Sequence, residues 1–257
     1  MAESKMSESE VLLLMLDISG YTKFMVATRD SMIHGQLIIS QLIEALIEKA
    51  DLPLQVLELE GDAVFLYAVC QPGNPVWDKF EKEFVEKLLE FIDTFFNTVQ
   101  KIINSDLCPC SACRHVVNLK IKAVAHLGKA LFHQVKQFQR VSGPDVIIVH
   151  RLLKNSVPSH QYILVTESAF PLVKEEHRNR FTEGSESYDE IGDIKTRVLI
   201  LDEGVKDGTP QKAAAIRVYS LAWTMWLMMK ALLVRLGLMK AGHFLNIPQG
   251  GTSINTQ

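Results

Sequence analysis

The sequence predicts an α+β fold, a ferredoxin-like sheet with helices on one face and a helical extension at the C-terminus. Three observations lead to this prediction. Short apolar or alternating runs between turn residues are typical of strands. Two long segments carry apolar residues every three or four positions, which is typical of helices. Their order along the chain, β-α-β-β-α-β, is that of a ferredoxin-like unit.

The elements follow from apolar spacing and from the residues that end each segment. Asp51 and Pro53 end the first helix, Pro144 opens a later one, and Gly192-Asp193 indicates a hairpin turn. We expect strands at 11–17, 54–60, 62–69, 117–126, 129–136 (after a turn at Gly128), 162–165, 186–191 and 195–201. We expect helices at 21–49, 77–104, 143–155 and 168–175.

The composition is that of a globular protein able to bury a large core. The chain has 257 residues, of which 47% are hydrophobic and 22% charged, with a net charge of −3. This charge gives no global attraction to nucleic acid, so we expect no nucleic-acid partner. The expected organisation is a polar tail at 1–9, a main domain at 10–202, a linker at 203–212 and an apolar helical extension with a polar tail at 213–257.

The segment 218–239 is apolar and contains tryptophans, but Lys230 and Arg235 interrupt it. Its longest uncharged run, 218–229, has 12 residues, whereas a membrane span needs about 20. A helix packed on the domain or on a second subunit is one interpretation, and a peripheral helix at a membrane surface is the other. The N-terminus lacks the pattern of a secretion signal, so we expect a cytoplasmic protein.

Three of the four cysteines are close together, at Cys108, Cys110 and Cys113. Their spacing allows a structural Zn²⁺ site, with Cys70 or His115 as the fourth ligand. The alternative is a loop of free thiols in a reducing compartment.

Two aspartates lie at the ends of expected strands. Asp17 closes the apolar run LLLML and precedes Ile-Ser-Gly-Tyr-Thr, and Asp62 follows the turn glycine of LELEGD. If the two carboxylates meet at one edge of the sheet, they form an oxygen site for Mg²⁺ or Mn²⁺.

These motifs give the main domain a resemblance to class III adenylate and guanylate cyclases. The segment after Asp17 resembles the family's Asp-Ile-x-Gly-Phe-Thr, the Asp62 hairpin its Lys-x-x-Gly-Asp, and 143–151 its Gly-Asp-x-Val-Asn-x-Ala-x-Arg helix. More narrowly, the chain is similar to an uncharacterised, mainly bacterial branch with a Cys-x-Cys-x-x-Cys loop and a His-Arg-Leu-Leu-Lys-Asn helix.

The resemblance implies a role for each matched residue. Asp17, Asp62 and the Ile18 carbonyl would hold two metal ions, as in two-metal phosphoryl transfer. Arg151 would stabilise charge on the α-phosphate, and Glu58 would contact the base. The site would lie between two chains of a head-to-tail homodimer. Backbone amides would bind phosphate at Ser19, Gly20, Tyr21 and Thr22, with Lys154 as a further phosphate contact.

Three positions differ from the family pattern. Ile147 stands where an Asn orients the ribose, and Arg140 where an Asp or Cys contacts the purine. Glu58 replaces a Lys. Because guanine presents N–H donors on its pairing edge, a carboxylate favours guanine over adenine.

Two functions follow from these residues. The first is a divergent cyclase that converts a purine nucleoside triphosphate to a 3′,5′-cyclic monophosphate and pyrophosphate. The alternative is a catalytically degenerate regulatory module that binds nucleotide or metal. This module would lie at a membrane surface if the segment 218–239 is a peripheral helix.

Overall fold

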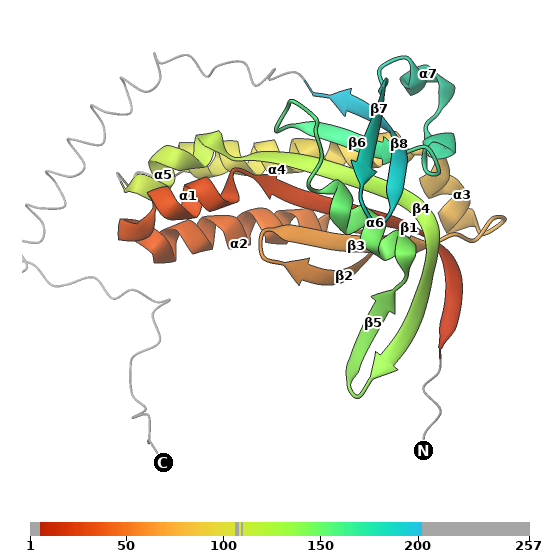
Figure 1. Ribbon diagram of the computed structural model, residues 1–257. Helices are drawn as coiled ribbons and strands as arrows, with labels where there is room; N and C mark the ends of the chain where they lie inside the picture. Colours follow the sequence, from red (N-terminus) through yellow and green to blue (C-terminus); the bar gives the residue numbers. More distant parts are fainter. Residues whose placement is uncertain (1–5, 106–107, 109, 202–257) are drawn as a thin grey trace, which may run out of the picture. The chain divides into compact units, whose positions relative to one another are not determined.

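The computed structural model describes residues 6–105, 108 and 110–201 (Figure 1). These residues belong to the first of two units, Met1–Glu203. The expected linker and the segment 218–239 lie outside the described residues. Within the described part of the chain, no helix has the length and apolar character needed to cross a membrane.

Eight strands of the described residues form one sheet with the order β2-β3-β1-β4-β6-β8-β7, and β5 pairs with β4. The first four strands are in the ferredoxin-like order, and every neighbouring pair among them is antiparallel. The α+β prediction is therefore confirmed. The strands are β1 (Ser7–Ser19), β2 (Gln55–Glu60), β3 (Ala63–Val69), β4 (Lys120–Val135), β5 (Phe138–Ser142), β6 (Tyr162–Thr166), β7 (Thr182–Tyr188) and β8 (Gly192–Ile200).

Helices cover both faces of the sheet, which corrects the prediction of a single helical face. The long helices α2 and α4 lie side by side on one face (Figure 1). The shorter α6 packs on the other face, against β4 and β1. The α-helices are α1 (Tyr21–Ala27), α2 (Met32–Glu48), α3 (Pro75–Lys82), α4 (Phe84–Ser105), α5 (Ser111–His115), α6 (Pro144–Leu152) and α7 (Glu175–Arg178). Three 3₁₀ turns are η1 (Arg29–Ser31), η2 (Val116–Asn118) and η3 (Phe170–Leu172).

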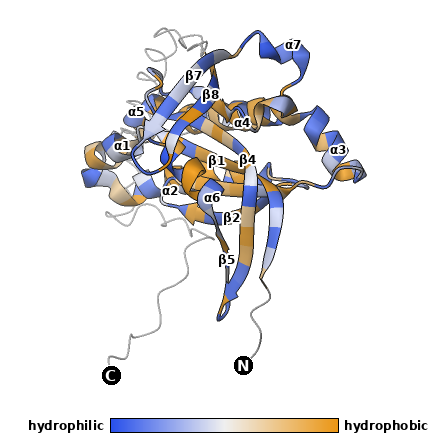
Figure 2. Cartoon of the chain, turned by 45° about the vertical axis from the view of Figure 1, so that its right-hand side comes forward, coloured by the Kyte–Doolittle hydropathy of each residue, from blue (hydrophilic) through white to orange (hydrophobic). Residues whose placement is uncertain are grey.

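Strand β1 is buried on both faces, because alternate side chains of a strand point to opposite sides. Leu12, Leu14 and Leu16 belong to the core under α2 and α4. Leu13 and Met15 belong to a second core under α6. Figure 2 shows the hydrophobic colour on α6 and the hydrophilic colour on α7. By the same alternation, Asp17 is on the α6 side of the sheet.

The two longest predicted helices are each broken. The first helix stops at Thr28, whose hydroxyl donates to the Met25 carbonyl at 3.4 Å, and η1 separates α1 from α2. The second break falls at Glu83, which leaves helical geometry at φ −112°. There, Phe80 and Phe84 pack edge to face, with ring centroids 6.1 Å apart. Both phenylalanines are buried, so the chain bends where it can bury both rings.

The predicted turn at Gly128 is also wrong, since β4 runs through it without a break. A Cβ atom at Gly128 would collide with the Asp145 carboxyl group, so this glycine is explained by a close approach. The chain instead turns after β4, where Lys136 has φ 55°. The β7–β8 turn likewise precedes Gly192, which is already the first residue of β8.

Candidate functional site

Asp17 and Asp62 come together at the end of β1. In the antiparallel register, Asp17 lies opposite Ala63, the residue after Asp62. The Ile18 amide donates a hydrogen bond to the Asp62 carbonyl at 3.3 Å. Both aspartates are half-buried. The fold therefore places two carboxylates beside each other where the sheet meets the β2–β3 turn.

The pKa of Asp62 reports this proximity. Burial raises the pKa, and the negative charge of Asp17 raises it further, to about 6. A backbone hydrogen bond and the ammonium group of Lys122 act in the opposite direction without cancelling the rise. When two carboxylates lie close together in a partly desolvated place, protonation of one of them or binding of a cation between them is favoured.

Lys122 supplies positive charge at this site. It lies directly opposite Asp17 in the β1–β4 ladder, and its Nζ is 3.0 Å from Asp17 Oδ2. The same Nζ donates to the Leu153 carbonyl at 2.8 Å. The side chains of Lys122 and Asp17 are only 17% and 18% exposed, so this ion pair is screened less than a surface pair. Lys122 was not among the predicted site residues, although the alternation of KIKAVAH places it on the polar face of its strand.

The predicted phosphate-binding backbone forms the turn from β1 into α1. Ser19 is buried, and Gly20 has φ 90°, a left-handed conformation that favours glycine. Tyr21 packs against the core, and Thr22 is exposed. A cavity of about 710 Å³ lies between this turn and η2, lined among others by Ser19, Gly20 and Lys23.

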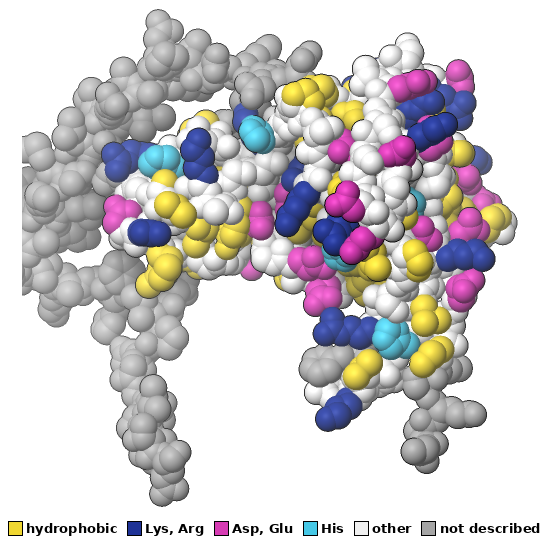
Figure 3. All heavy atoms as spheres, viewed as in Figure 1, with side chains coloured by type: hydrophobic (Ala, Val, Ile, Leu, Met, Phe, Trp, Pro, Cys, Tyr) yellow, Lys and Arg dark blue, Asp and Glu magenta, His cyan; other side chains and the backbone are white. Residues whose placement is uncertain are grey.

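Glu58 and Arg140 form an ion pair between β2 and β5. Arg140 Nη1 is 3.3 Å from Glu58 Oε2, and both side chains are about half exposed, at 52% and 51%. A bulge in β2 between Val56 and Glu58 puts Glu58 opposite Phe65. Phe65 belongs to the core under α6. Glu58, which we predicted to contact the base, is thus paired with Arg140, which differs from the family pattern. Figure 3 shows acidic and basic side chains interspersed around β2, α6 and β5.

Helix α6 carries Arg151 near its C-terminal end, close to the Leu153 carbonyl that Lys122 contacts. Arg151 is exposed beside a cavity of about 300 Å³ that is otherwise lined by residues 187–191 of the β7–β8 turn. Tyr188 donates through its hydroxyl to the carbonyls of Arg151 and Lys154, at 2.9 and 3.2 Å. Lys154 is exposed next to this turn, and Ile147 is 54% exposed on the same helix. Neither Asp17 nor Asp62 lines the cavity beside Arg151.

The cysteine loop meets helix α2. Cys108, Cys110, Cys113 and His34 each offer a ligand atom, and these atoms lie within 4.8 Å of one another. His34 takes the fourth position, for which we predicted Cys70 or His115. His115 instead uses its Nδ1 in a 2.7 Å hydrogen bond with the Ser111 carbonyl. Cys70 follows β3, and its amide donates to the Glu10 carbonyl at 2.9 Å.

The electrostatic surroundings of the cysteines are not uniform. Burial raises the pKa of Cys110, but hydrogen bonds from the Cys113 amide, the neighbouring thiols and His34 outweigh it and lower the pKa to about 6. Burial, with the nearby Glu10 charge, raises the pKa of Cys70 to about 12. Cys70 therefore stays a thiol at neutral pH.

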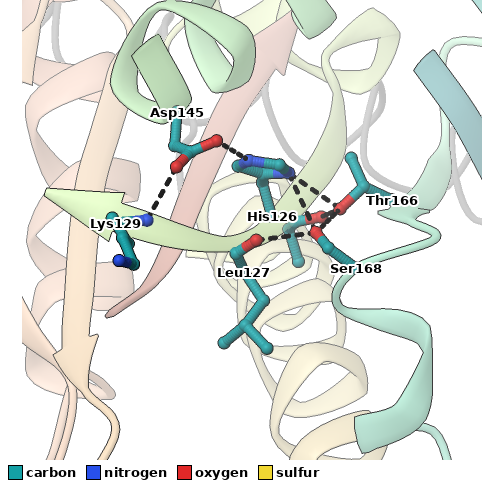
Figure 4. A network of polar contacts seen from close by, with 7 residues as sticks. His126, Leu127, Lys129, Asp145, Thr166 and Ser168 are labelled. Atoms are coloured by element: carbon teal, nitrogen blue, oxygen red, sulfur yellow. Dashed lines mark hydrogen bonds and ion pairs between the residues drawn. The ribbon is translucent and has the colours of Figure 1, made fainter. Parts of the chain in front are cut away.

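A buried histidine ties α6 to the sheet (Figure 4). His126 Nε2 is 3.0 Å from Asp145 Oδ1, and its Nδ1 is 2.9 Å from the Thr166 hydroxyl. Asp145 also accepts from the Lys129 amide at 2.7 Å, and the Ser168 hydroxyl donates to the Leu127 carbonyl at 2.7 Å. Each polar group has a partner, so this network anchors α6 to β4 and β6.

The fold is that of the catalytic domains of class III nucleotidyl cyclases. The chain resembles the adenylyl cyclase CyaB from P. aeruginosa, with a TM-score of 0.53 at 10% identity over 78% of this chain and 99% of that one. It resembles the guanylyl cyclase Cya2 with a TM-score of 0.54 at 11% identity, over 78% and 96% of the two chains. A class III adenylyl cyclase-like ATP-binding protein from Pseudomonas aeruginosa gives a TM-score of 0.55 at 14% identity, over 68% and 37%.

Sequence comparison adds a relative that is less distant. The uncharacterized protein Rv2561/Rv2562 of Mycobacterium tuberculosis is 31% identical over 163 residues, which cover 63% of this chain and 73% of the relative. The chain belongs to the family of this mycobacterial protein. Residues 39–162 also match a family described as "Protein of unknown function (DUF2652)".

Proposed function

We propose that this protein is a divergent nucleotidyl cyclase that converts a purine nucleoside triphosphate to a 3′,5′-cyclic monophosphate and pyrophosphate. The observation that carries the proposal is the meeting of Asp17 and Asp62 beside Lys122 on one face of a cyclase-like sheet. In this reaction the ribose 3′-oxygen bonds to the α-phosphorus, the bond from that phosphorus to the bridging oxygen breaks, and the hydroxyl proton leaves.

The residues present fit a divalent metal site. Burial, and after it the charge of Asp17, raise the pKa of Asp62, because two carboxylates share one partly desolvated place, and a cation bound there would compensate their charge. Asp17, Asp62 and the Ile18 carbonyl would hold Mg²⁺ or Mn²⁺, which prefer such oxygen ligands. When bound, the two ions would lower the pKa of the attacking hydroxyl and neutralise charge on the phosphates.

Lys122 has two roles in this proposal. Without metal, its ammonium group neutralises Asp17 at 3.0 Å. With metal bound to the carboxylates, the same ammonium group would face the anionic triphosphate instead. The backbone from Ser19 to Thr22 is the second phosphate contact, because it turns from the strand into α1 next to Asp17.

Arg151 would serve the site of a second chain. Its described contacts are with the β7–β8 turn, and none of them is with Asp17 or Asp62. The assignment to a second chain rests on the resemblance to class III cyclases, whose site lies between two catalytic domains. A head-to-tail homodimer would pair Asp17 and Asp62 of one subunit with Arg151 of the other. Arg151 would then stabilise the charge that develops on the α-phosphate.

Glu58 and Arg140 would read the base as a pair, and they favour GTP over ATP. Glu58 can accept from the N1–H and N2–H groups of guanine, and Arg140 can donate to its O6 and N7 atoms. Their carboxylate and guanidinium groups already meet at 3.3 Å, so each is held near the other. Adenine has neither an O6 acceptor nor the N1–H donor.

We expect a low turnover rate because of Ile147. Its side chain is 54% exposed on α6 and has no donor to orient the ribose. Loss of one oriented donor costs about a hundredfold or more in rate. A low turnover is therefore part of the proposal.

The test is product identification with the full-length chain. Incubation with GTP or ATP and Mn²⁺, followed by mass spectrometry, should give the cyclic monophosphate and pyrophosphate, with more product from GTP. Asp62→Ala should abolish both products, whereas Asp93→Ala, at an exposed position of α4, should not. If Mn²⁺ and nucleotide raise the melting temperature of wild type without any product, the protein is a binding module and the cyclase proposal is wrong.

A mixing experiment tests the shared site. Asp62→Ala and Arg151→Ala chains should each be inactive alone. When subunits exchange freely, half of the dimers are mixed and each has one intact site, so about a quarter of wild-type activity should return. If no activity returns although subunit exchange is demonstrated with a label, the assignment of Arg151 to the second chain is wrong.

A further inference from the structure

The cluster of His34, Cys108, Cys110 and Cys113 lies outside the proposed nucleotide site. Its residues come from two distant segments, since His34 and Cys110 are 76 positions apart in the sequence. His34 is in the first turn of α2, Cys108 and Cys110 are in the connection from α4 to α5, and Cys113 is in α5. All four are partly buried, and all four ligand atoms lie within 4.8 Å of one another.

The distances between the ligand atoms fit a tetrahedral ion. Zn²⁺ binds sulfur at about 2.3 Å and nitrogen at about 2.0 Å, so its ligand atoms are separated by about 3.8 Å for two sulfurs and about 3.5 Å for sulfur and nitrogen. Cys110 Sγ lies 3.5 Å from Cys113 Sγ and 3.2 Å from His34 Nδ1. Cys113 Sγ lies 3.6 Å from His34 Nδ1, which is closer than its 3.8 Å to Nε2. Nδ1 is therefore the nitrogen placed to bind an ion.

Neighbouring polar residues hold the two segments in place. The hydroxyl groups of Ser31 and Ser111 are 2.7 Å apart, and the Ala112 amide donates to Ser31 at 3.3 Å. Ser111 also donates to the Asp30 carboxylate. These bonds fix the start of α5 against η1 and α2. They thus join the two chain segments that carry the cluster.

We propose that His34, Cys108, Cys110 and Cys113 bind one Zn²⁺ ion in a closed structural site. Three thiolates and one imidazole complete a tetrahedral shell and leave no open position for substrate or water. Soft thiolate ligands favour Zn²⁺ over the Mg²⁺ or Mn²⁺ that the two aspartates would select. Binding releases the thiol protons, and the bound site has a net charge of about −1 from three thiolates on a dication.

The proposed ion would clamp the α4–α5 connection to the start of α2. Helix α5 also contacts α1, which begins just after the turn at Gly20. The cavity beside that turn is lined by residues of α1 and of η2, the segment that follows α5. Zinc would therefore fix the wall of the cavity without taking part in the chemistry.

The test is the metal content of the untagged full-length chain, purified under reducing conditions from zinc-supplemented cells. Elemental analysis by mass spectrometry should find about one zinc per chain. His34→Ala and Cys113→Ser should lower this content at least fivefold. His115→Ala and Cys70→Ser are matched controls and should keep it, because neither residue belongs to the cluster. His34→Cys should also keep the zinc, since a thiolate can replace the imidazole.

A second measurement needs no variant. Wild type reconstituted with Co²⁺ should show the visible absorption of tetrahedral cobalt with thiolate ligands. A wild-type chain that holds under about 0.2 zinc per chain and gives no such absorption would overturn the proposal. Zinc that survives His34→Ala but is lost in His115→Ala would overturn the assignment of His34 as the fourth ligand.

Discussion

The carboxylate site and the cysteine cluster differ in how much of each is complete within one chain. Asp17 and Asp62 meet beside Lys122, whereas the described contacts of Arg151 are with the β7–β8 turn and not with the aspartates. The cysteine cluster brings four ligands of its own together at close range. The first arrangement leaves room for a substrate and a second chain, whereas the second closes on itself. A catalytic site needs an open position for the substrate, whereas a structural metal site has all its positions filled by the protein.

The largest expected effect separates the two sites by function. Asp17→Ala should lower cyclic nucleotide formation more than about a hundredfold, because it removes a metal ligand and the partner of Lys122. It should leave the zinc content at about one per chain. Product assays and elemental analysis on the same sample check both outcomes. Equal loss of zinc and of activity would show that the two sites are not independent.

Zinc removal should act mainly on stability. A chelator, or Cys113→Ser, should lower the melting temperature by about 5 °C or more, because an ion that binds only the folded state stabilises it. Adding Mg²⁺ should not restore the melting temperature, since thiolates prefer zinc. Differential scanning calorimetry measures the shift. Asp17→Ala serves as the comparison: it keeps the zinc site, so the chelator should lower its melting temperature by as much as in wild type, whereas Cys113→Ser should show little further change with chelator.

A smaller effect concerns the base. Arg140→Ala should reduce kcat/KM for GTP by about 10- to 100-fold, since a bidentate contact to guanine contributes about 1–3 kcal/mol. The value for ATP should change less, because adenine lacks the O6 acceptor. Competition between the two nucleotides gives the ratio directly. An equal loss for both would remove Arg140 from base selection and leave it as a surface residue.

The smallest effect concerns pH. The pKa of Asp62 is about 6 in the fold, above its usual 3.8. Between about pH 4 and 6 the folded chain binds more protons at this group than the unfolded chain, so the free energy of unfolding falls as pH rises. Asp62→Asn should remove this part of the pH dependence in metal-free protein. Urea unfolding across this range measures it, and an unchanged slope would contradict it.

The fold class was predictable because it depends on local patterns of apolar spacing and turn residues. The meeting of Asp17 and Asp62 was predicted from motifs that resemble class III cyclases, since the β1–β3 pairing that joins them is not local. A strand followed by Ser-Gly and a hairpin after Glu-Gly each appear within a few residues. Lys122 was missed because its partner is fixed by the β1–β4 register, which no local pattern shows. His34 was missed for the same reason, since helix α2 meets the cysteine loop only in the folded chain.

The errors in the elements have a common cause. Thr28 and Glu83 are not strong helix breakers, so the interruptions depend on tertiary packing rather than on propensity. Gly128 was interpreted as a turn because glycine is unfavourable within a strand. Its strand position is explained only by the carboxylate of Asp145, which comes from a helix that follows later in the chain. The metal and substrate roles of the site residues remain predictions for the experiments above.

The double burial of β1 has a consequence for motion at the nucleotide site. Its residues from Val11 to Leu16 have no solvent exposure, and the strand is paired on both edges. Amide protons in such a strand exchange with solvent only when a large part of the domain opens. Asp17 extends directly from this segment, so we expect its carboxylate to be held by a part of the sheet that exchanges slowly.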